Sequence, residues 1–423
     1  MATTATSVAS ICAAARHASR VLARLDGETR AAALHAMASA LEARSDEILE
    51  ANARDMEAGV EAEIGGALLD RLKLTPERLE GIASDVRVVA SLPDPVGETI
   101  EGHRLPNGLD VRKVRVPLGV VAVVYEARPN VTIDCSALCI KSGNAIVLRG
   151  SSIAAHSNAV LAAVARDAVV AAGLPEGTVS LVAGGGREEL GELATQSENV
   201  DLIIPRGGEG LKNALKAVAT VPVIYAAAGN CHVFVDASAD LDDAVAIAVN
   251  AKVQRPGVCN SAETLLVHAD VAGEYLPRVL PELRERGVEL RVDARARSLA
   301  GSLGDSLLDA VEEDWATEYL ALVLAVKVVD SVQEAIEHVN RYGSGHSEAI
   351  VTGSVDAAQA FTSTVDAAAV YVNASTRFTD GGVFGMGAEI GNSTQKLHAR
   401  GPIGVRELCT FKYVVEGSGQ VRP

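Results

Sequence analysis

The chain is poor in the cations that bind polyanions. It has 38 Lys and Arg residues against 55 Asp and Glu residues, so its formal net charge at pH 7 is −17. This acidic balance argues against nucleic acid or an anionic membrane as the main partner. No apolar run approaches the roughly 20 residues that span a bilayer, so we predict no membrane partner either. A length of 423 residues suggests two or three domains.

Cysteine is scarce as well, and the six cysteines form no regular framework of spacings. Such usage indicates a reducing compartment, and we predict a cytoplasmic location. Cys135 and Cys139 lie four positions apart, on one face of a predicted apolar helix, which favours a place in the core. They could instead form half of a metal site. No second pair and no nearby histidine completes such a site, so we predict no metal.

The common nucleotide and catalytic fingerprints are also absent from the sequence. No Gly-x-Gly-x-x-Gly motif follows a predicted strand, and Gly385, Gly387 and Gly391 have the wrong spacing for one. The sequence has no Walker motif, no zinc-hydrolase histidine pair and no nucleophile elbow. A cofactor must therefore be inferred from other features.

Periodic apolar patterns are abundant, and they begin with an alanine-rich helical region over residues 1–90. Next comes a predicted hairpin of residues 102–109 and 110–116, because Asn107-Gly108 between alternating residues favours a tight turn. Such an arm has little core of its own, so we expect it to pack on another subunit. The segment 408–415 is predicted as a strand that could pair with the arm.

From Gly119 onward, apolar strands alternate with helices, which indicates parallel sheets with helices on both faces. The predicted strands are residues 120–125, 145–148, 179–182, 201–204, 221–224, 264–267, 322–328 and 369–372. The predicted helices include residues 132–141, 154–172, 241–253, 273–284 and 332–340. Ligands bind such sheets at the carboxyl ends of the strands, which points to the turns after Tyr125, Leu148, Val182 and Ile204.

Cys259 is the candidate nucleophile. It follows Pro256-Gly257, which would end the helix over 241–253 and leave the next residues on an exposed connection. A thiolate is a strong nucleophile near neutral pH, and a cation such as Arg255 would favour it. A free cysteine is more often a small buried residue. The polar setting of Cys259 favours the catalytic interpretation.

Several segments together resemble a known family. They are residues 125–132 (YEARPNVT), 141–149 (KSGNAIVLR), 204–208 (IPRGG), 254–260 (QRPGVCN), 376–382 (TRFTDGG) and 384–390 (FGMGAEI). In this order, over nearly the whole chain, they resemble the γ-glutamyl phosphate reductases, also called glutamate-5-semialdehyde dehydrogenases, of the aldehyde dehydrogenase superfamily. The resemblance implies an aldehyde dehydrogenase-like α/β fold with a Rossmann-type cofactor domain, an α/β catalytic domain and a small β oligomerisation arm.

The resemblance also implies domain boundaries. The cofactor-binding domain would comprise residues 1–101 and 120–230, with a returning segment at about 386–405. The catalytic domain would comprise residues 231–385, and the oligomerisation arm residues 102–119 and 406–423. A homo-oligomer, either a dimer or a tetramer, would follow.

The implied reaction is the NADPH-dependent reduction of L-glutamyl 5-phosphate to L-glutamate 5-semialdehyde in proline biosynthesis. Cys259 would form a thioester, and Asn130 would donate to the oxyanion beside the Cys259 backbone N–H. Asn130 could instead be only a turn residue after Pro129. Because the acyl phosphate is labile, a transient contact with the glutamate 5-kinase that makes it is also possible.

One departure from general aldehyde dehydrogenases bears on the reaction. Those enzymes carry a Glu-Leu-Gly-Gly segment whose glutamate activates water, whereas residues 224–230 here are IYAAAGN and contain no carboxylate. This favours an acyl-phosphate reductase. A hydrolytic or an acylating, coenzyme A-dependent aldehyde dehydrogenase is the alternative, and an inactive scaffold that binds the kinase is a third. The alanines at 226–228 also depart from the glycine-richer stretch expected of the reductases.

The resemblance implies cofactor contacts too. Arg149 and Ser152 stand where NAD-preferring relatives have a lysine and a glutamate, so a 2′-phosphate is accommodated and NADPH is favoured. Gly207 and Gly208 would let a helix start approach the pyrophosphate. Glu318 falls where the superfamily's glutamate holds the nicotinamide ribose. Arg149 could instead be a solvated surface charge, and Glu318 an ordinary polar residue beside a strand.

An anionic substrate requires cations in the matched motifs. The candidates are Arg255, Arg377, Lys141 and Arg128, of which Arg255 and Arg377 are favoured. Arginines also hold loops through charge-assisted hydrogen bonds, so either role is open for each. The sequence does not distinguish the cation that meets phosphate from the one that meets the α-carboxylate.

Overall fold

The computed structural model describes residues 7–184, 186–225 and 229–422. It forms two compact units between which the chain passes several times. The first unit comprises Met1–Tyr225, Gly385–Gly391 and Ile403–Pro423, and the second comprises Ala226–Phe384 and Asn392–Pro402. The returning segment predicted at about 386–405 is therefore divided, because its middle part belongs to the second unit.

The N-terminal region of the first unit is helical, as predicted. Its helices are α1 (Val8–Leu22), α2 (Gly27–Ala43), α3 (Ser45–Glu61), α4 (Gly66–Leu72) and α5 (Pro76–Ser91). Local sequence explains where two of them begin. The Asp26 carboxylate accepts from the Thr29 N–H at the start of α2, and the Thr75 hydroxyl caps α5, whose first residue is Pro76.

The first unit also contains a four-stranded parallel sheet of order β5-β4-β3-β6. Its strands are β3 (Val120–Tyr125), β4 (Ala145–Gly150), β5 (Val179–Leu181) and β6 (Leu202–Arg206). Its helices are α6 (Asn130–Lys141), α7 (Ala155–Ala171), α8 (Arg187–Ala194) and α9 (Glu209–Val218). All residues of β3 and β4 are buried, as expected for continuous apolar strands covered on both faces.

The strand predicted over 221–224 is wrong in its extent. Only a single bridge joins Ile203 to Val223 there. The neighbouring residue is Pro222, which has no N–H to donate to a ladder, although its carbonyl accepts from the Ile203 N–H at 2.9 Å.

One helical stretch corrects the prediction about apolar runs. Residues Ser152–Ala171 are long and apolar enough to cross a membrane, by length and composition only. In the structure α7 packs against α2, α3 and α6, and its buried residues include Leu161, Val164 and Val169. Such packing is that of a core helix.

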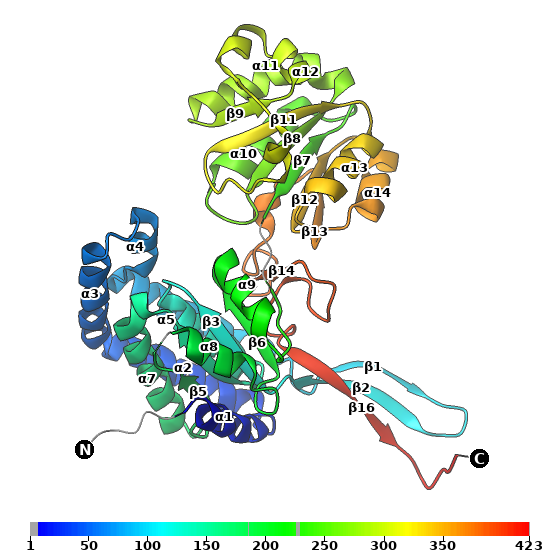
Figure 1. Ribbon diagram of the computed structural model, residues 1–423. Coiled ribbons are helices and arrows are strands. Elements are labelled where there is room, and N and C mark those ends of the chain that lie inside the picture. Colours follow the sequence, from blue (N-terminus) through cyan, green and yellow to red (C-terminus); the bar gives the residue numbers. More distant parts are fainter. Residues whose placement is uncertain (1–6, 185, 226–228, 423) are drawn as a thin grey trace. The chain divides into compact units, whose positions relative to one another are not determined.

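The predicted hairpin and the C-terminal strand form a separate antiparallel sheet, which Figure 1 shows as an extended arm of β1, β2 and β16. These strands are β1 (Thr99–Arg104), β2 (Asp110–Pro117) and β16 (Cys409–Glu416). The pairing of β16 with β2 confirms the prediction, and its register runs from Cys409 opposite Pro117 to Glu416 opposite Asp110. Gly108 has φ +88° in the hairpin loop, a conformation that glycine adopts without strain.

The second unit is built on a seven-stranded parallel sheet of order β10-β9-β11-β8-β7-β12-β13. Its strands are β7 (Cys231–Val235), β8 (Ala262–His268), β9 (Glu289–Val292), β10 (Leu308–Asp309), β11 (Val323–Val329), β12 (Ser347–Val351) and β13 (Ala369–Val372), with a small separate pair of β14 (Asn392–Ser393) and β15 (Gly401–Pro402). The helices are α10 (Leu241–Val253), α11 (Ala269–Glu285), α12 (Ala294–Leu299), α13 (Val332–Tyr342) and α14 (Val355–Thr364).

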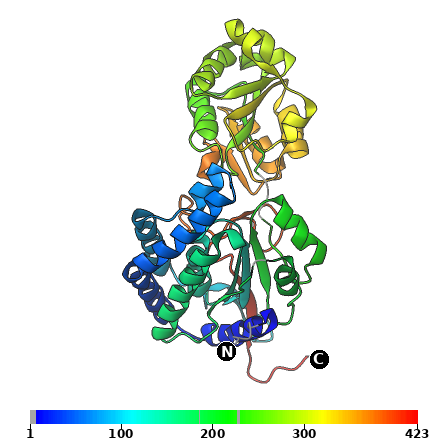
Figure 2. The same ribbon diagram turned by 60° about the vertical axis from the view of Figure 1, so that its left-hand side comes forward.

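Alternate residues of these strands face two hydrophobic cores. Val233 and Val235 of β7 pack with α10, α11 and α12, whereas Phe234 packs with α13 and α14. The helices accordingly lie on opposite faces of the sheet, as Figures 1 and 2 show. An α/β fold with parallel sheets covered on both faces is therefore confirmed.

Candidate active site

The connection between α10 and β8 carries Cys259 in the second unit. Cys259 is partly exposed, whereas Cys12, Cys135, Cys139, Cys231 and Cys409 are all buried. The predicted core placement of Cys135 and Cys139 is thus correct. Of the six thiols, Cys259 is the one that a ligand in solvent can approach.

Hydrogen bonds fasten this connection to residues 376–379. The Asn260 side-chain amide donates to the Arg377 carbonyl at 3.2 Å and to the Thr379 carbonyl at 2.9 Å. The Thr376 hydroxyl donates in turn to the Asn260 carbonyl at 2.7 Å. Two of the matched motifs, far apart in sequence, are therefore held together next to Cys259.

Arg377 lies within electrostatic range of Arg255 and Cys259. The Arg377 Nε donates to the Gln254 Oε1 at 2.9 Å, which directs the guanidinium toward the Cys259 connection. Burial lowers the pKa of Arg377, the charge of Arg255 lowers it further, and Cys259 raises it. Two adjacent cations that repel each other are better neutralised by an anion between them. The structure thus brings together three of the predicted site residues.

Gly229 and Cys231 also contact the Cys259 backbone, and the sequence analysis missed both. A Cβ on Gly229 would lie 1.5 Å from the Cys259 carbonyl oxygen, so only glycine fits there. The Cys231 thiol donates to the same oxygen at 3.2 Å, and burial raises the pKa of Cys231. The only feature of the sequence that could have indicated these contacts was the glycine in the 224–230 segment.

Glu318 is placed by the same glycine. Its Oε1 accepts from the Gly229 N–H at 2.6 Å, and the side chain is partly buried. Glu318 is therefore held by a specific backbone hydrogen bond, unlike an ordinary solvated carboxylate beside a strand. The neighbouring alanines at 226–228 lie outside the described residues.

Apart from Glu318, which belongs to the second unit, the proposed cofactor residues lie in the first unit, at the carboxyl ends of β4 and β6. Arg149 is the next-to-last residue of β4 and is only 7% exposed, and its Nη2 donates to the Gly186 carbonyl at 2.5 Å. Burial lowers the pKa of Arg149, and the charges of Glu189 and Glu126 raise it. The alternative of a solvated surface charge is therefore wrong. Ser152, just beyond, is exposed.

The turn after β6 places Gly207 and Gly208 at the start of α9. A Cβ on Gly207 would lie 2.7 Å from Glu126 Cδ and 2.8 Å from a Leu211 methyl carbon, so the glycine permits close packing. Gly208 precedes the helix, and its N–H donates to Glu126 Oε2 at 3.0 Å. The helix start therefore binds an anionic oxygen, as helix N-termini do.

The two ends of α6 have different roles. Asn130 begins the helix, and its side-chain amide donates to Asp134 Oδ2 at 2.8 Å. Burial raises the pKa of Asp134 to about 6, and Asp85 raises it further, whereas the bond from Asn130 and the charge of Arg206 lower it. A side-chain amide has two N–H donors, and this bond uses one of them.

Lys141 ends α6, about 17 Å from Asn130 for a helix of 12 residues. It is buried, and its ammonium donates to the Ala90 carbonyl at 2.7 Å. This bond connects α6 to α5 and gives Lys141 a structural role, while its contact with substrate stays a prediction. Arg128, in the turn before α6, is partly exposed.

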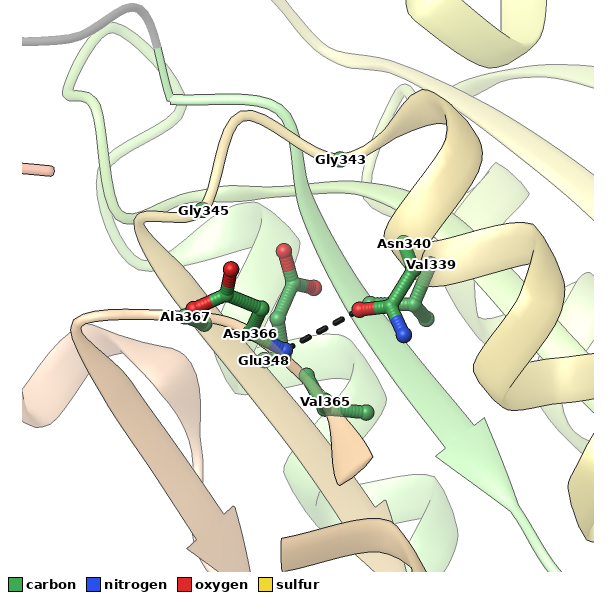
Figure 3. Close-up of a pocket in the computed structure, with 8 residues that line it drawn as sticks. All are labelled: Val339, Asn340, Gly343, Gly345, Glu348, Val365, Asp366 and Ala367. Atoms are coloured by element: carbon green, nitrogen blue, oxygen red, sulfur yellow. Dashed lines mark hydrogen bonds between the residues drawn. The ribbon is translucent and has the colours of Figure 1, made fainter. Parts of the chain in front are cut away.

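A separate cavity of about 330 Å³ opens in the second unit between the end of α13 and the segments before β12 and β13 (Figure 3). Glu348 and Asp366 line it, and the Asp366 N–H donates to Asn340 Oδ1 at 3.0 Å. Burial raises the pKa of Glu348, while Asp366 forms ion pairs with Arg400 and Lys396. Within the described residues, the cavity is lined by none of the predicted site residues.

The chain is similar to known proteins over most of its length. A model of the aldehyde dehydrogenase family matches residues 1–296 and 308–414. The gamma-glutamyl phosphate reductases of Moorella thermoacetica and Thermobifida fusca are each 54% identical over 408 residues, 96% of this chain and 97% of theirs.

Solved structures extend the likeness to the fold. The crystal structure of gamma-glutamyl phosphate reductase from Thermotoga maritima is 46% identical, with a TM-score of 0.95 over 98% of this chain and 100% of that chain. An acetylating aldehyde dehydrogenase from Geobacillus thermoglucosidasius is 19% identical, with a TM-score of 0.69 over 98% of this chain and 97% of that chain, and it shares the fold. The chain therefore belongs to the aldehyde dehydrogenase family and, within it, to the γ-glutamyl phosphate reductases.

Proposed function

We propose that the chain reduces L-glutamyl 5-phosphate to L-glutamate 5-semialdehyde and phosphate, with NADPH as reductant and Cys259 as nucleophile. The observation that carries this proposal is the partly exposed Cys259 thiol beside Arg255 and Arg377. The names of relatives at 54% identity support the choice of substrate. The reaction would be a step of proline biosynthesis in the cytoplasm.

In the first step the Cys259 thiolate attacks the carbonyl carbon of the acyl phosphate. A carbon–sulfur bond forms, the bond from that carbon to the phosphate oxygen breaks, and phosphate leaves with the electron pair. The two arginines reduce the free energy of this step by neutralising the leaving group. They also favour the thiolate over the thiol.

NADPH, when bound, supplies the hydride that reduces the thioester. Cys259 holds the resulting tetrahedral alkoxide until the carbon–sulfur bond breaks, which releases the aldehyde and restores the thiolate. The negative oxygen needs donors at both tetrahedral stages. We assign these roles to the Cys259 backbone N–H and the Asn130 amide. The assignment of Asn130 comes from the family resemblance.

Water must be kept from the thioester for this cycle to close. Hydrolysis needs a positioned base, and the sequence of residues 224–230 offers no carboxylate for that role. Phosphate is then the leaving group in the reductive direction and the attacking nucleophile in the reverse direction. This favours the reductase over a hydrolytic dehydrogenase.

The residues at the edge of the first sheet suit a phosphorylated nucleotide. Arg149 is a buried cation whose Nε has no hydrogen-bond partner among the described residues, so it can donate to a 2′-phosphate. Ser152 adds no negative charge next to it, unlike the glutamate of NAD-preferring relatives. The Gly208 amide would hold a phosphate oxygen if Glu126 were displaced from it.

We further propose that the arm assembles the chain into a homo-oligomer, a dimer or a tetramer. Phe411, Tyr413 and Val415 alternate along β16 and are all exposed, so they form an apolar face that another subunit could cover. Loss of the oligomer in light scattering of Phe411→Ser/Tyr413→Ser would support this. The acyl phosphate would come from a glutamate 5-kinase, with at most a transient contact.

The decisive experiment runs the reaction backward, with glutamate 5-semialdehyde and NADP⁺, with and without inorganic phosphate. Strict dependence on phosphate supports the reductase. Turnover without phosphate identifies a hydrolytic dehydrogenase, and turnover only with coenzyme A identifies an acylating one. Cys259→Ala should abolish turnover while Cys12→Ala, at a buried cysteine of α1, retains it. An active Cys259→Ala variant contradicts the proposed nucleophile.

A further inference from the structure

A fully buried ion pair lies at the two ends of the Cys259 connection. Lys252, in the last turn of α10, and Glu263, near the start of β8, are eleven positions apart, and Lys252 Nζ lies 2.5 Å from Glu263 Oε2. Both side chains are 0% exposed. The pair therefore joins the two ends of the connection. It fixes the positions at which the segment that carries Cys259 leaves α10 and enters β8.

The second oxygen of Glu263 reaches a different segment. Glu263 Oε1 accepts from the Leu320 N–H at 3.3 Å. Leu320 has φ +52°, a left-handed conformation that is unfavourable for leucine, and its side chain is 45% exposed. Such a residue is strained and persists only where its surroundings hold it. The Glu263 carboxylate supplies a buried acceptor that does so.

Leu320 lies in the same segment as Glu318, between Ala316 and the start of β11. This segment is called the Glu318 segment. Glu318 is bonded to the Gly229 N–H, and Gly229 in turn lies against the Cys259 carbonyl. Leu320 also lies near the connection, because its carbonyl oxygen is 3.8 Å from a Cβ built on Gly257. One buried carboxylate thus joins the Cys259 connection to the Glu318 segment by a short series of contacts.

Stability alone does not account for this arrangement. Replacing a buried ion pair by apolar residues of similar volume is commonly neutral or stabilising, because two charges no longer have to be desolvated. Burial raises the pKa of Glu263 to about 7 and lowers that of Lys252. A protonated Glu263 would still accept a hydrogen bond from the Leu320 N–H, so this contact does not require the carboxylate to be charged.

We propose that Glu263 is a positioning residue, and that it aligns Cys259 with the Glu318 segment through the Leu320 N–H. The proposal rests on the proposed role of Cys259 as nucleophile. It assigns Glu263 no contact with substrate. Its effect should appear in kcat and leave substrate binding nearly unchanged.

Two double variants separate positioning from stability. Lys252→Met/Glu263→Gln and Lys252→Met/Glu263→Met both remove the charges at similar volume, but only glutamine keeps an acceptor for the Leu320 N–H. We expect kcat of the glutamine variant within about 3-fold of wild type, and kcat of the methionine variant about 10- to 100-fold lower, with similar KM and Tm in both. Equal kcat values in the two variants would overturn the proposal.

A measurement on the unaltered chain decides the matter if the methionine variant does not fold. The Leu320 N–H, in an exposed residue, should exchange with deuterium slowly because its acceptor is buried; rapid exchange would overturn the proposal. Cys259→Ala serves as the separate control. If that variant keeps turning over, the proposed nucleophile is wrong, whereas an inactive Cys259→Ala variant with equal double variants removes only the positioning role.

Discussion

The backbone of Gly229 lies directly against the carbonyl group of Cys259. A Cβ at position 229 would approach the carbonyl oxygen to 1.5 Å, far inside any van der Waals contact. The N–H of the same glycine donates to Glu318. One residue without a side chain therefore sets the distance between the backbone of the proposed nucleophile and the carboxylate assigned to the nicotinamide ribose.

Gly229→Ala should inactivate the enzyme, because either the Cys259 connection or the Glu318 segment must move by an ångström or more. A displacement of this size commonly reduces kcat about 100-fold. Gly257→Ala is the matched control in the same connection, since its Cβ would meet nothing closer than 3.8 Å. Steady-state kinetics in the phosphate-dependent direction provides the comparison, and similar losses in both variants would contradict the explanation.

Asn130→Ala should lower kcat by about 100-fold, since loss of one oxyanion donor raises the barrier by about 3 kcal/mol. The fold should survive, because the Asn130 amide makes its bond to Asp134 at a partly exposed helix start. Asn130→Asp is an informative second variant, because it replaces the donor by an acceptor of the same shape. Activity of either variant near that of wild type would exclude an oxyanion role.

Ser152→Glu should raise the KM for NADPH by at least about 10-fold. The new carboxylate next to Arg149 repels the 2′-phosphate and neutralises the charge of Arg149. Position 152 is exposed, so the substitution should leave the fold intact. The KM for NADH is the internal control and should stay constant or fall. A parallel rise of both KM values would show that the site binds the two cofactors through other residues.

Arg377→Gln should slow alkylation of Cys259 by iodoacetamide at pH 7, because the guanidinium near the sulfur favours the thiolate. We expect a decrease of about 3- to 10-fold, with a rise in KM for the acyl phosphate of about 10-fold or more. Arg278→Gln, at an exposed residue of α11, is the control and should leave both quantities unchanged. Mass spectrometry of the modified peptide identifies the alkylated cysteine.

The free energy of unfolding of Asp134→Asn, relative to that of wild type, should increase as the pH rises. In the folded chain the pKa of Asp134 is raised to about 6, so between about pH 4 and pH 6 folding takes up a proton. The resulting stability is fully present below about pH 4 and is lost as the pH rises through about 6. The variant should therefore gain about 2 kcal/mol over wild type on going from pH 4 to pH 8.

Urea unfolding at both pH values measures this change in stability. The groups that act on Asp134 are Asn130, Asp85 and Arg206, and all remain in the variant. A constant difference between variant and wild type across the range would contradict the assigned pKa. If the advantage of the variant instead became smaller as the pH rises, the pKa of Asp134 would be lowered on folding and not raised.

The sequence predicted the elements whose patterns are long and local. The buried strand β3, helix α10 and strand β13 were predicted with bounds that match the structure. The strands β7, β9 and β12 were missed, although the equally short β13 was predicted, so length alone does not explain the difference. The strand over 221–224 failed at Pro222, a signal that was present in the sequence.

For the candidate site too, residues within short matched segments were predicted, whereas contacts between segments that are distant in sequence were not. Cys259 and its two arginines could be found because each belongs to a recognisable segment. The contacts of Gly229, Cys231 and Glu263 depend on residues that are distant in sequence and meet only in the folded sheet. The bond of Lys141 to the Ala90 carbonyl could not be predicted either, because a motif gives the residue type and not the direction of its side chain along α6.

The pairing of β16 with β2 has a consequence for synthesis on the ribosome. Strand β2 ends at Pro117, and its partner across the ladder begins at Cys409, so about two thirds of the chain lies between them. During translation one edge of β2 stays without its neighbour, and the second unit emerges before that neighbour does. A nascent chain halted before residue 409 would expose this edge to any other extended peptide, so the final residues serve as its protection against aggregation.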